Sequence, residues 1–140
     1  MGTVRKKIIR ENEEFPAVAF GVSSNEKIWK LAWELNRALS LNLALNNNEE
    51  ISGEKNEVYS SLHPGGDFDY YLMDHASTGK KIPPKAREFR YWLFIKPRDS
   101  ALADVNTLLL QLRSVKIISL AMDISDTINI NDWIYEPGKF

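Results

Sequence analysis

The sequence predicts an α+β fold, a two-layer sandwich in which two helices cover one face of a mainly antiparallel sheet. Three observations predict it. Apolar residues recur with a helical period near residue 31 and again near residue 108, and a nearly continuous apolar run occupies residues 89–95 between them. The expected element order is β-α-β-β-β-α-β, of broadly ferredoxin-like character with an extra strand. The length of 140 residues suits a single domain, 1–140.

The first strand and the first helix are predicted in residues 17–39. Residues 17–22 form a short apolar segment, and Ser23 with Glu26 has the spacing of a capping box for a helix from about residue 25 to residue 39. The inner stripe of this helix consists of Ile28, Leu31, Leu35 and Leu39.

Two tryptophans lie on a neighbouring face of this first helix. Trp29 and Trp33 are four residues apart, which is about one helical turn. We expect them to pack into the core, with Trp133 of the C-terminal tail covering the helix. The other interpretation is an apolar patch that a partner recognises.

The middle of the chain is expected to form an antiparallel meander of three strands, at 58–63, 68–73 and 89–95. The polar segment 46–56 has no periodicity and predicts an exposed loop. Residues 64–67 predict a turn, and a stiffened connection with two prolines precedes the third strand.

The strand at 89–95 carries the candidate surface. Its run is nearly continuous, as in a central strand that is buried on both faces. Alternation places Phe89, Tyr91, Leu93 and Ile95 on one face. If the helices cover that face, the open face forms an interface or ligand surface made of Arg90, Trp92, Phe94, Tyr59 and Tyr71.

The last helix and strand follow Pro97, which ends the third strand of the meander. Asp99 or Ser100 is the expected cap, and the helical stripe consists of Leu102, Val105, Leu108, Leu112 and Val115. Residues 116–123 are expected to form the last strand, with Ile118, Leu120 and Met122 on one face. The tail from residue 126 should fold back onto the body.

Composition narrows the class of protein. The absence of cysteine excludes disulfides, thiolate metal sites and cysteine nucleophiles. No apolar run has the length of a membrane span or of a signal peptide, so we expect a cytoplasmic protein without a membrane partner.

The charge is unevenly distributed. Residues 1–79 carry 8 Lys and Arg against 12 Asp and Glu, residues 80–98 carry 7 against 1, and residues 99–140 carry 3 against 6. The basic centre predicts a patch made of Lys80, Lys81, Lys85, Arg87 and Arg90.

Several strings resemble the bacterial IPExxVD family, a group of small proteins without an established activity. They are residues 21–43, the pair Ile82-Pro83 and residues 112–115. Pro84 stands where the family has Glu, and Arg90 lies where Asp would follow, so no role of the family's acidic pair passes to this chain. The resemblance implies the fold and a bacterial cytoplasmic setting.

Candidate chemistry is sparse. His63 and His75 are the only imidazoles and are expected to lie too far apart to share a metal ion. No nucleophile elbow or phosphate-binding loop occurs, and we assign no catalytic, cofactor-binding or metal-binding residue.

These observations predict a non-enzymatic binding or assembly module, joined as a homodimer through its sheet face or an edge strand, or bound to another protein. The first alternative is binding of RNA or another nucleic acid through segment 80–98. There Arg87, Phe89 and Phe94 match an RNA-recognition pattern, but Glu88 and Arg90 replace its small residues. The second alternative is an enzyme that uses the turn containing His63 and Asp67.

Overall fold

The structure, a computed structural model, describes residues 17–46, 50–51, 54–55, 58–62, 67–75, 82–97 and 104–130. In this part of the chain, six strands form one sheet in the order β2-β5-β6-β7-β1-β8, and every neighbouring pair is antiparallel. The strands are β1 (Val18–Ser24), β2 (Ala44–Asn46), β5 (Val58–Ser61), β6 (Phe68–Asp74), β7 (Tyr91–Pro97) and β8 (Ile118–Asp123). The helices are α1 (Ile28–Leu39), α2 (Pro84–Arg87) and α3 (Val105–Arg113), and β3 (Glu50–Ile51) pairs with β4 (Glu54–Lys55) apart from the main sheet.

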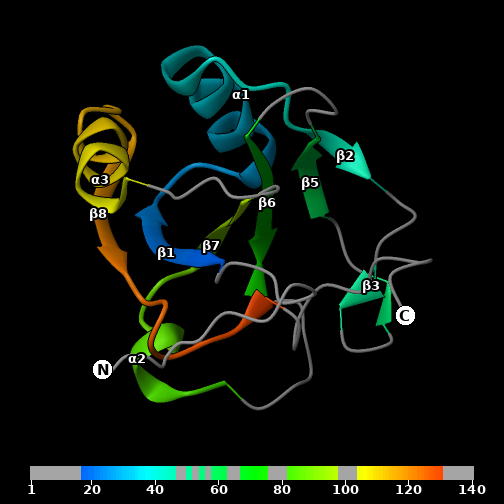
Figure 1. Cartoon of the computed structure of the whole chain (residues 1–140), viewed down its shortest axis with the longest axis vertical. Coiled ribbons are helices and arrows are strands. Elements are labelled where there is room, and N and C mark those ends of the chain that lie inside the picture. Colours follow the sequence, from blue (N-terminus) through cyan, green and yellow to red (C-terminus); the bar gives the residue numbers. More distant parts are fainter. Residues whose placement is uncertain are drawn as a thin grey trace, which may run out of the picture.

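The α+β fold class is confirmed. The meander β5-β6-β7 forms as predicted, and β1 lies between β7 and β8. Strands β6, β7, β1 and β8 with α1 and α3 make a ferredoxin-like unit, which β5 and β2 extend at one edge. Figure 1 shows α1 and α3 together on the upper side of the sheet.

A helix-side core fills the space between the sheet and these two helices. Leu31 and Leu35 of α1 are buried against Phe20 of β1 and Leu93 of β7, and Leu112 of α3 joins the same cluster. Period-two alternation along the strands supplies the sheet side of this core. The inner stripe of α1 is therefore confirmed.

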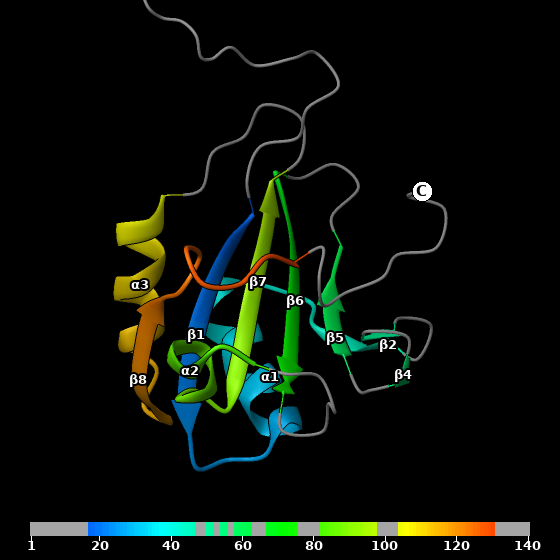
Figure 2. The same ribbon diagram turned by 90° about the horizontal axis from the view of Figure 1, so that it is seen from below.

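A second core lies on the opposite face of the sheet. Short α2 and residues 124–130 cross that face, as Figures 1 and 2 show. Their buried side chains Ala86, Ile124, Ile128 and Ile130 pack on the outward side chains of the sheet. The tail therefore folds back as predicted, at least over residues 126–130, whereas Trp133 lies outside the described residues.

The ends of the helices correct two predicted caps. The N-cap of α1 is Lys27, without a side-chain hydrogen bond, so the predicted capping box of Ser23 and Glu26 is wrong. The N-cap of α3 is Asp104, whose Oδ1 accepts a hydrogen bond from the Thr107 N–H at 3.2 Å. The earlier capping candidates at 99 and 100 lie outside the described residues.

Short elements were missed where the sequence has little periodicity. The segment 46–56, predicted as a loop, contains β3 and β4, and β2 begins just before it. The connection with two prolines contains α2, whose first residue is Pro84. Proline suits this position because the first N–H of a helix needs no intrahelical partner.

Strand β7 begins at Tyr91, two residues later than predicted. Phe89 therefore leaves the predicted helix-side face and packs in the second core. Its ring lies directly over Gly21, where an added Cβ would come within 2.4 Å of ring atoms. Only glycine at this position of β1 leaves room for that ring.

The faces of β8 also differ from the prediction. Ile118 is buried in the helix-side core, but Leu120 and Met122 are exposed, and Ala121 takes the inward position after a shift in register against β1 at Ser23/Ser24.

Candidate functional site

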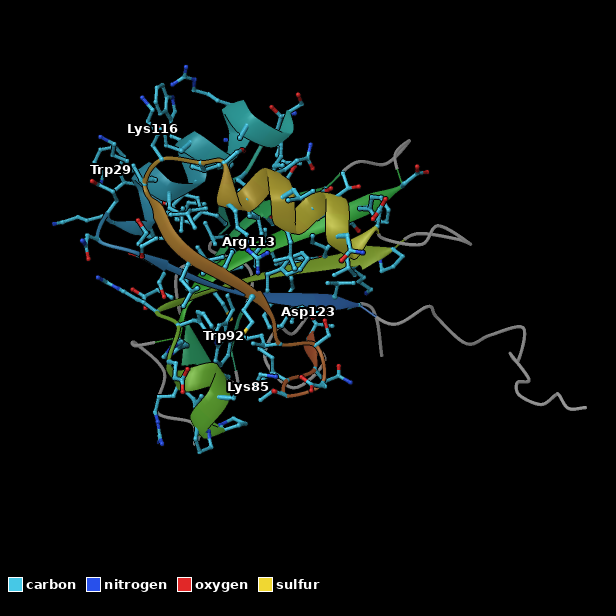
Figure 3. The ribbon with its side chains drawn as sticks, turned by 90° about the vertical axis from the view of Figure 1, so that its left-hand side faces the viewer. Trp29, Lys85, Trp92, Arg113, Lys116 and Asp123 are labelled. Carbon is cyan, nitrogen blue, oxygen red and sulfur yellow. The ribbon has the colours of Figure 1, made fainter. Side chains whose placement is uncertain are left out.

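The predicted aromatic surface is buried within the chain itself. Trp92 and Phe94 are both 0% exposed. The indole N–H of Trp92 donates to the Ala86 carbonyl of α2 at 3.0 Å, and the ring of His75 lies 4.7 Å from the indole, centroid to centroid. Figure 3 shows Trp92 on the side of the sheet where α2 and Lys85 lie. The expectation that this face is open is wrong, because α2, Phe89 and residues 124–130 cover it.

The other members of that surface do not lie together. Tyr71 shares the face of Trp92 and is buried with it. Tyr59 is half-buried on the opposite face, against the helix-side core. Arg90 is exposed just before β7 and pairs with Asp74 at 3.1 Å. The five residues therefore do not form one accessible surface.

The basic patch is partly neutralised. The ammonium of Lys85 lies 3.3 Å from the carboxylate of Asp126, and this hydrogen bond lowers the pKa of Asp126. The hydrogen bond from Arg90 to Asp74 raises the pKa of Arg90. Arg87 is exposed on α2, and Lys80 and Lys81 lie outside the described residues. Two of the three described cations of the patch therefore have acidic partners.

The histidine-based hypotheses gain no support. His63 lies outside the described residues, and Asp67 is exposed. His75 is only 7% exposed. Its Nε2–H donates to the Phe89 carbonyl, and its Nδ1 is buried without a hydrogen-bond partner. Among the described residues, no three His, Cys, Asp or Glu side chains are grouped as metal ligands.

Among the described residues, the largest exposed apolar side chains are instead on α1. Trp29 is 60% exposed and Trp33 is 54% exposed. The guanidinium of Arg37 lies 4.8 Å above the ring of Trp33, and a carboxylate oxygen of Glu34 lies 4.0 Å from Arg37. Trp29, Trp33 and Arg37 form one row along the outer side of α1, and we name this row the tryptophan stripe. The expectation that the two tryptophans belong to the core is wrong.

Sequence spacing contains the signal for this stripe. The core-facing residues of α1 repeat from Ile28 through Leu31 and Leu35 to Leu39, and this row already fills one helix face. Trp29 and Trp33 lie outside it, on the side that faces away from the sheet. Packing on the domain's own sheet does not account for a second apolar row of this kind.

The two edges of the main sheet differ in length. Strand β2 has 3 residues and β8 has 6. Leu120 and Met122 of β8 are 52% and 43% exposed, and Arg113 of α3 donates two hydrogen bonds to the carbonyl of Ala121, at 3.2 and 2.9 Å.

Among the described residues, no helix has both the length and the apolar character needed to cross a bilayer. Comparisons of this chain with protein-family models, with curated protein sequences and with solved structures find no match, so the resemblance to the IPExxVD family stays a prediction.

Proposed function

We propose that this protein is a non-enzymatic binding module that associates with a second copy of itself through the tryptophan stripe of α1. The observation that carries the proposal is the exposure of Trp29 and Trp33, at 60% and 54%, on one side of one helix. Tryptophan and arginine are the side chains that most often dominate the energy of protein interfaces. Exposed apolar surface of this kind is typical of a docking site.

The pattern of the stripe suits a symmetric pair of helices. Trp33 is central, with Trp29 four residues before it and Arg37 four residues after it. If two copies of α1 cross antiparallel about a twofold axis at Trp33, Trp29 faces the partner's Arg37, and the reverse contact forms by symmetry. A guanidinium over an indole is a favourable cation–π contact, and the intramolecular pair of Arg37 and Trp33 already has this geometry.

Charge along the same side of α1 supports the antiparallel arrangement. Lys30 and Glu34 flank the stripe and carry opposite charges. Antiparallel pairing about Trp33 brings Lys30 of one copy toward the partner's Glu34. In a parallel pairing about a twofold axis, the side that carries Lys30 and Glu34 would face the opposite side of the partner's helix, so the two charges would not meet.

The other sites considered for association are less suitable. Trp92 and Phe94 are covered by the chain itself, β2 is short, and the carbonyl of Ala121 on β8 already accepts two hydrogen bonds. Binding of nucleic acid through segment 80–98 is the second candidate. It loses support because Lys85 and Arg90 have acidic partners, and because its aromatic side chains Trp92 and Phe94 are not accessible for stacking on bases. We keep the cytoplasmic setting as part of the proposal.

The test is the mass of the protein in solution, measured by sedimentation at several concentrations. We expect a dimer that Trp33→Ala weakens by a factor on the order of 30 or more, the change that corresponds to a hot-spot side chain of about 2 kcal/mol. Leu110→Ala is the matched control, because Leu110 is also an exposed apolar residue but lies on α3. It should leave the dimer unchanged.

Charge reversal gives an independent check on the same interface. Arg37→Glu should weaken the dimer, because it places a carboxylate over the face of the partner's indole. A wild-type protein that stays monomeric up to millimolar concentration would contradict the proposal. Binding of single-stranded RNA with a steep salt dependence, lost on replacing Arg87 and unaffected by Trp33→Ala, would favour the second candidate instead.

A further inference from the structure

The free edge of β8 is the second place where this fold can meet another chain. In the described part of the molecule β8 is the outermost strand of the sheet, beside β1. Its sequence from Ile118 to Asp123 contains no proline and no lysine, which are the residues that most often blunt an exposed edge. An edge of this kind needs another form of protection or a partner.

The direction of the backbone groups follows from the pairing of β8 with β1. The N–H of Ile124 donates to the carbonyl of Ala19 in β1 at 2.8 Å. In a strand, successive residues turn their N–H and C=O groups to opposite sides. Counting back from Ile124, the backbone groups of Ala121 therefore point away from β1, toward the free side of β8.

Arg113 occupies this free side. Its guanidinium donates to the outward carbonyl of Ala121 from both Nε and Nη2, at 3.2 and 2.9 Å. Figure 3 shows Arg113 between α3 and β8, whereas Lys116 lies near the turn that joins them. The fork of the guanidinium thus takes the position at which a neighbouring strand would donate its own N–H.

The side chains of β8 are self-complementary about Ala121. Leu120 and Met122 flank Ala121 and lie on the face of the sheet opposite α3, 52% and 43% exposed. In an antiparallel pair of two β8 strands centred on Ala121, Leu120 lies opposite the partner's Met122, and Ala121 exchanges both hydrogen bonds with the partner's Ala121. Leu120 and Met122 of the two copies would then cover one another.

We propose that the free edge of β8 is a latent strand-pairing surface whose partner is β8 of a second copy, and that Arg113 keeps it closed. Pairing about Ala121 requires Arg113 to leave the carbonyl. It also brings the guanidinium groups of two copies together at the twofold axis, where they repel each other. Arg113 therefore opposes this pairing by occupying the acceptor and by its charge.

The experiment compares wild type with Arg113→Ala by sedimentation and by amide hydrogen exchange at Ala121. In wild type the outward N–H of Ala121 should exchange quickly. In Arg113→Ala we expect a larger species, with exchange at Ala121 slowed by about tenfold or more as the amide enters an intermolecular ladder. This amide lies far along the chain from the tryptophan stripe and is not part of it, so the readout does not depend on whether α1 mediates a dimer.

Matched variants test the role of each group. Lys116→Ala removes a nearby exposed cation but leaves the Ala121 carbonyl covered, so it should behave as wild type. Leu120→Lys added to Arg113→Ala should restore the wild-type mass, because it places a charged side chain against the partner's Met122 in the paired strands. Arg113 is itself exposed, and circular dichroism checks that each variant is folded.

Three results would overturn the proposal. One is an Arg113→Ala protein of wild-type mass with fast exchange at Ala121. Another is a larger species in which the Ala121 amide still exchanges quickly, since association would then use another surface. The third is a Lys116→Ala protein that shows the same larger mass and slowed exchange as Arg113→Ala, since the loss of one positive charge would then explain both.

Discussion

At the scale of single residues, the position of Trp92 sets the character of the second face. Its indole is fully buried, donates to the Ala86 carbonyl and packs against the ring of His75. If this donor is removed, the Ala86 carbonyl stays buried without a hydrogen bond from the protein or from water. The resulting loss of stability is larger than the net contribution of an ordinary hydrogen bond. Trp92 therefore holds α2 on the sheet.

We expect Trp92→Phe to lower the free energy of unfolding by about 2–3 kcal/mol, through the unpaired Ala86 carbonyl and the lost ring volume. Chemical denaturation measures this. Leu110→Ala is the control and should change stability by less than about 0.5 kcal/mol, because Leu110 is exposed and lies outside the tryptophan stripe. Equal denaturation midpoints for the two variants would contradict the structural role of Trp92.

At the scale of elements, α3 depends on a carboxylate at its first turn. Asp104 accepts from the Thr107 N–H at 3.2 Å and from the Thr107 hydroxyl at 2.9 Å. The backbone hydrogen bond from Thr107 lowers the pKa of Asp104 from its ordinary value of 3.8. Since the folded-state pKa is the lower one, this contribution to stability is present above the unfolded pKa and is lost as the pH falls through the folded pKa.

Asp104→Asn tests this contribution, because asparagine also caps helices but does not titrate. At neutral pH wild type should be the more stable of the two. The difference between their urea midpoints should shrink as the pH falls below 3.8 and protonates Asp104. A difference that stays constant from neutral to acid pH would show that the charge of Asp104 does not stabilise α3.

How far the sequence predicts each element depends on periodicity. The stripe of Leu31 and Leu35 and the alternation along β7 have clear periods, and both are found. Alternation along a strand separates its two faces but does not show which elements cover each face. The prediction that the face of Trp92 is open is wrong for this reason. The continuous apolar run at 89–95 contained the correction, because a strand exposed on one face has polar residues on that face. Short α2 left no periodic signal beyond Pro84 at its start.

For the tryptophan stripe, the sequence leaves two interpretations, and the structure favours the second, an exposed apolar patch. Trp29 and Trp33 were assigned to the core because large apolar residues are usually buried. Their spacing relative to Leu31 and Leu35 places them on another side of α1. That this side is not covered by the described part of the chain is known only from the folded structure. The sequence also gives no sign of the contact between Arg113 and the Ala121 carbonyl, since no local pattern connects an arginine with a backbone carbonyl.

At the scale of the whole molecule, the sheet is stabilised from both sides, and the second side depends on residues 124–130. Ile128→Asp places a charge in the second core, where Ile128 is 7% exposed, and should lower the free energy of unfolding by more than about 3 kcal/mol. The opened face should also bind a hydrophobic dye. Met122→Asp is the matched control, because it adds the same charge at an exposed apolar position. Dye binding equal to that of wild type would contradict a continuous second core.

The position of this covering segment has a consequence for synthesis on the ribosome. Strands β6 and β7, which carry Tyr71, Met73, Trp92 and Phe94, leave the ribosome well before residues 124–130 do. Until then the growing chain exposes to the surrounding solution the part of this aromatic surface that α2 and Phe89 do not cover. Translation thus includes an interval in which the nascent protein is a substrate for chaperones that recognise apolar surface, and the arrival of Ile124, Ile128 and Ile130 ends it.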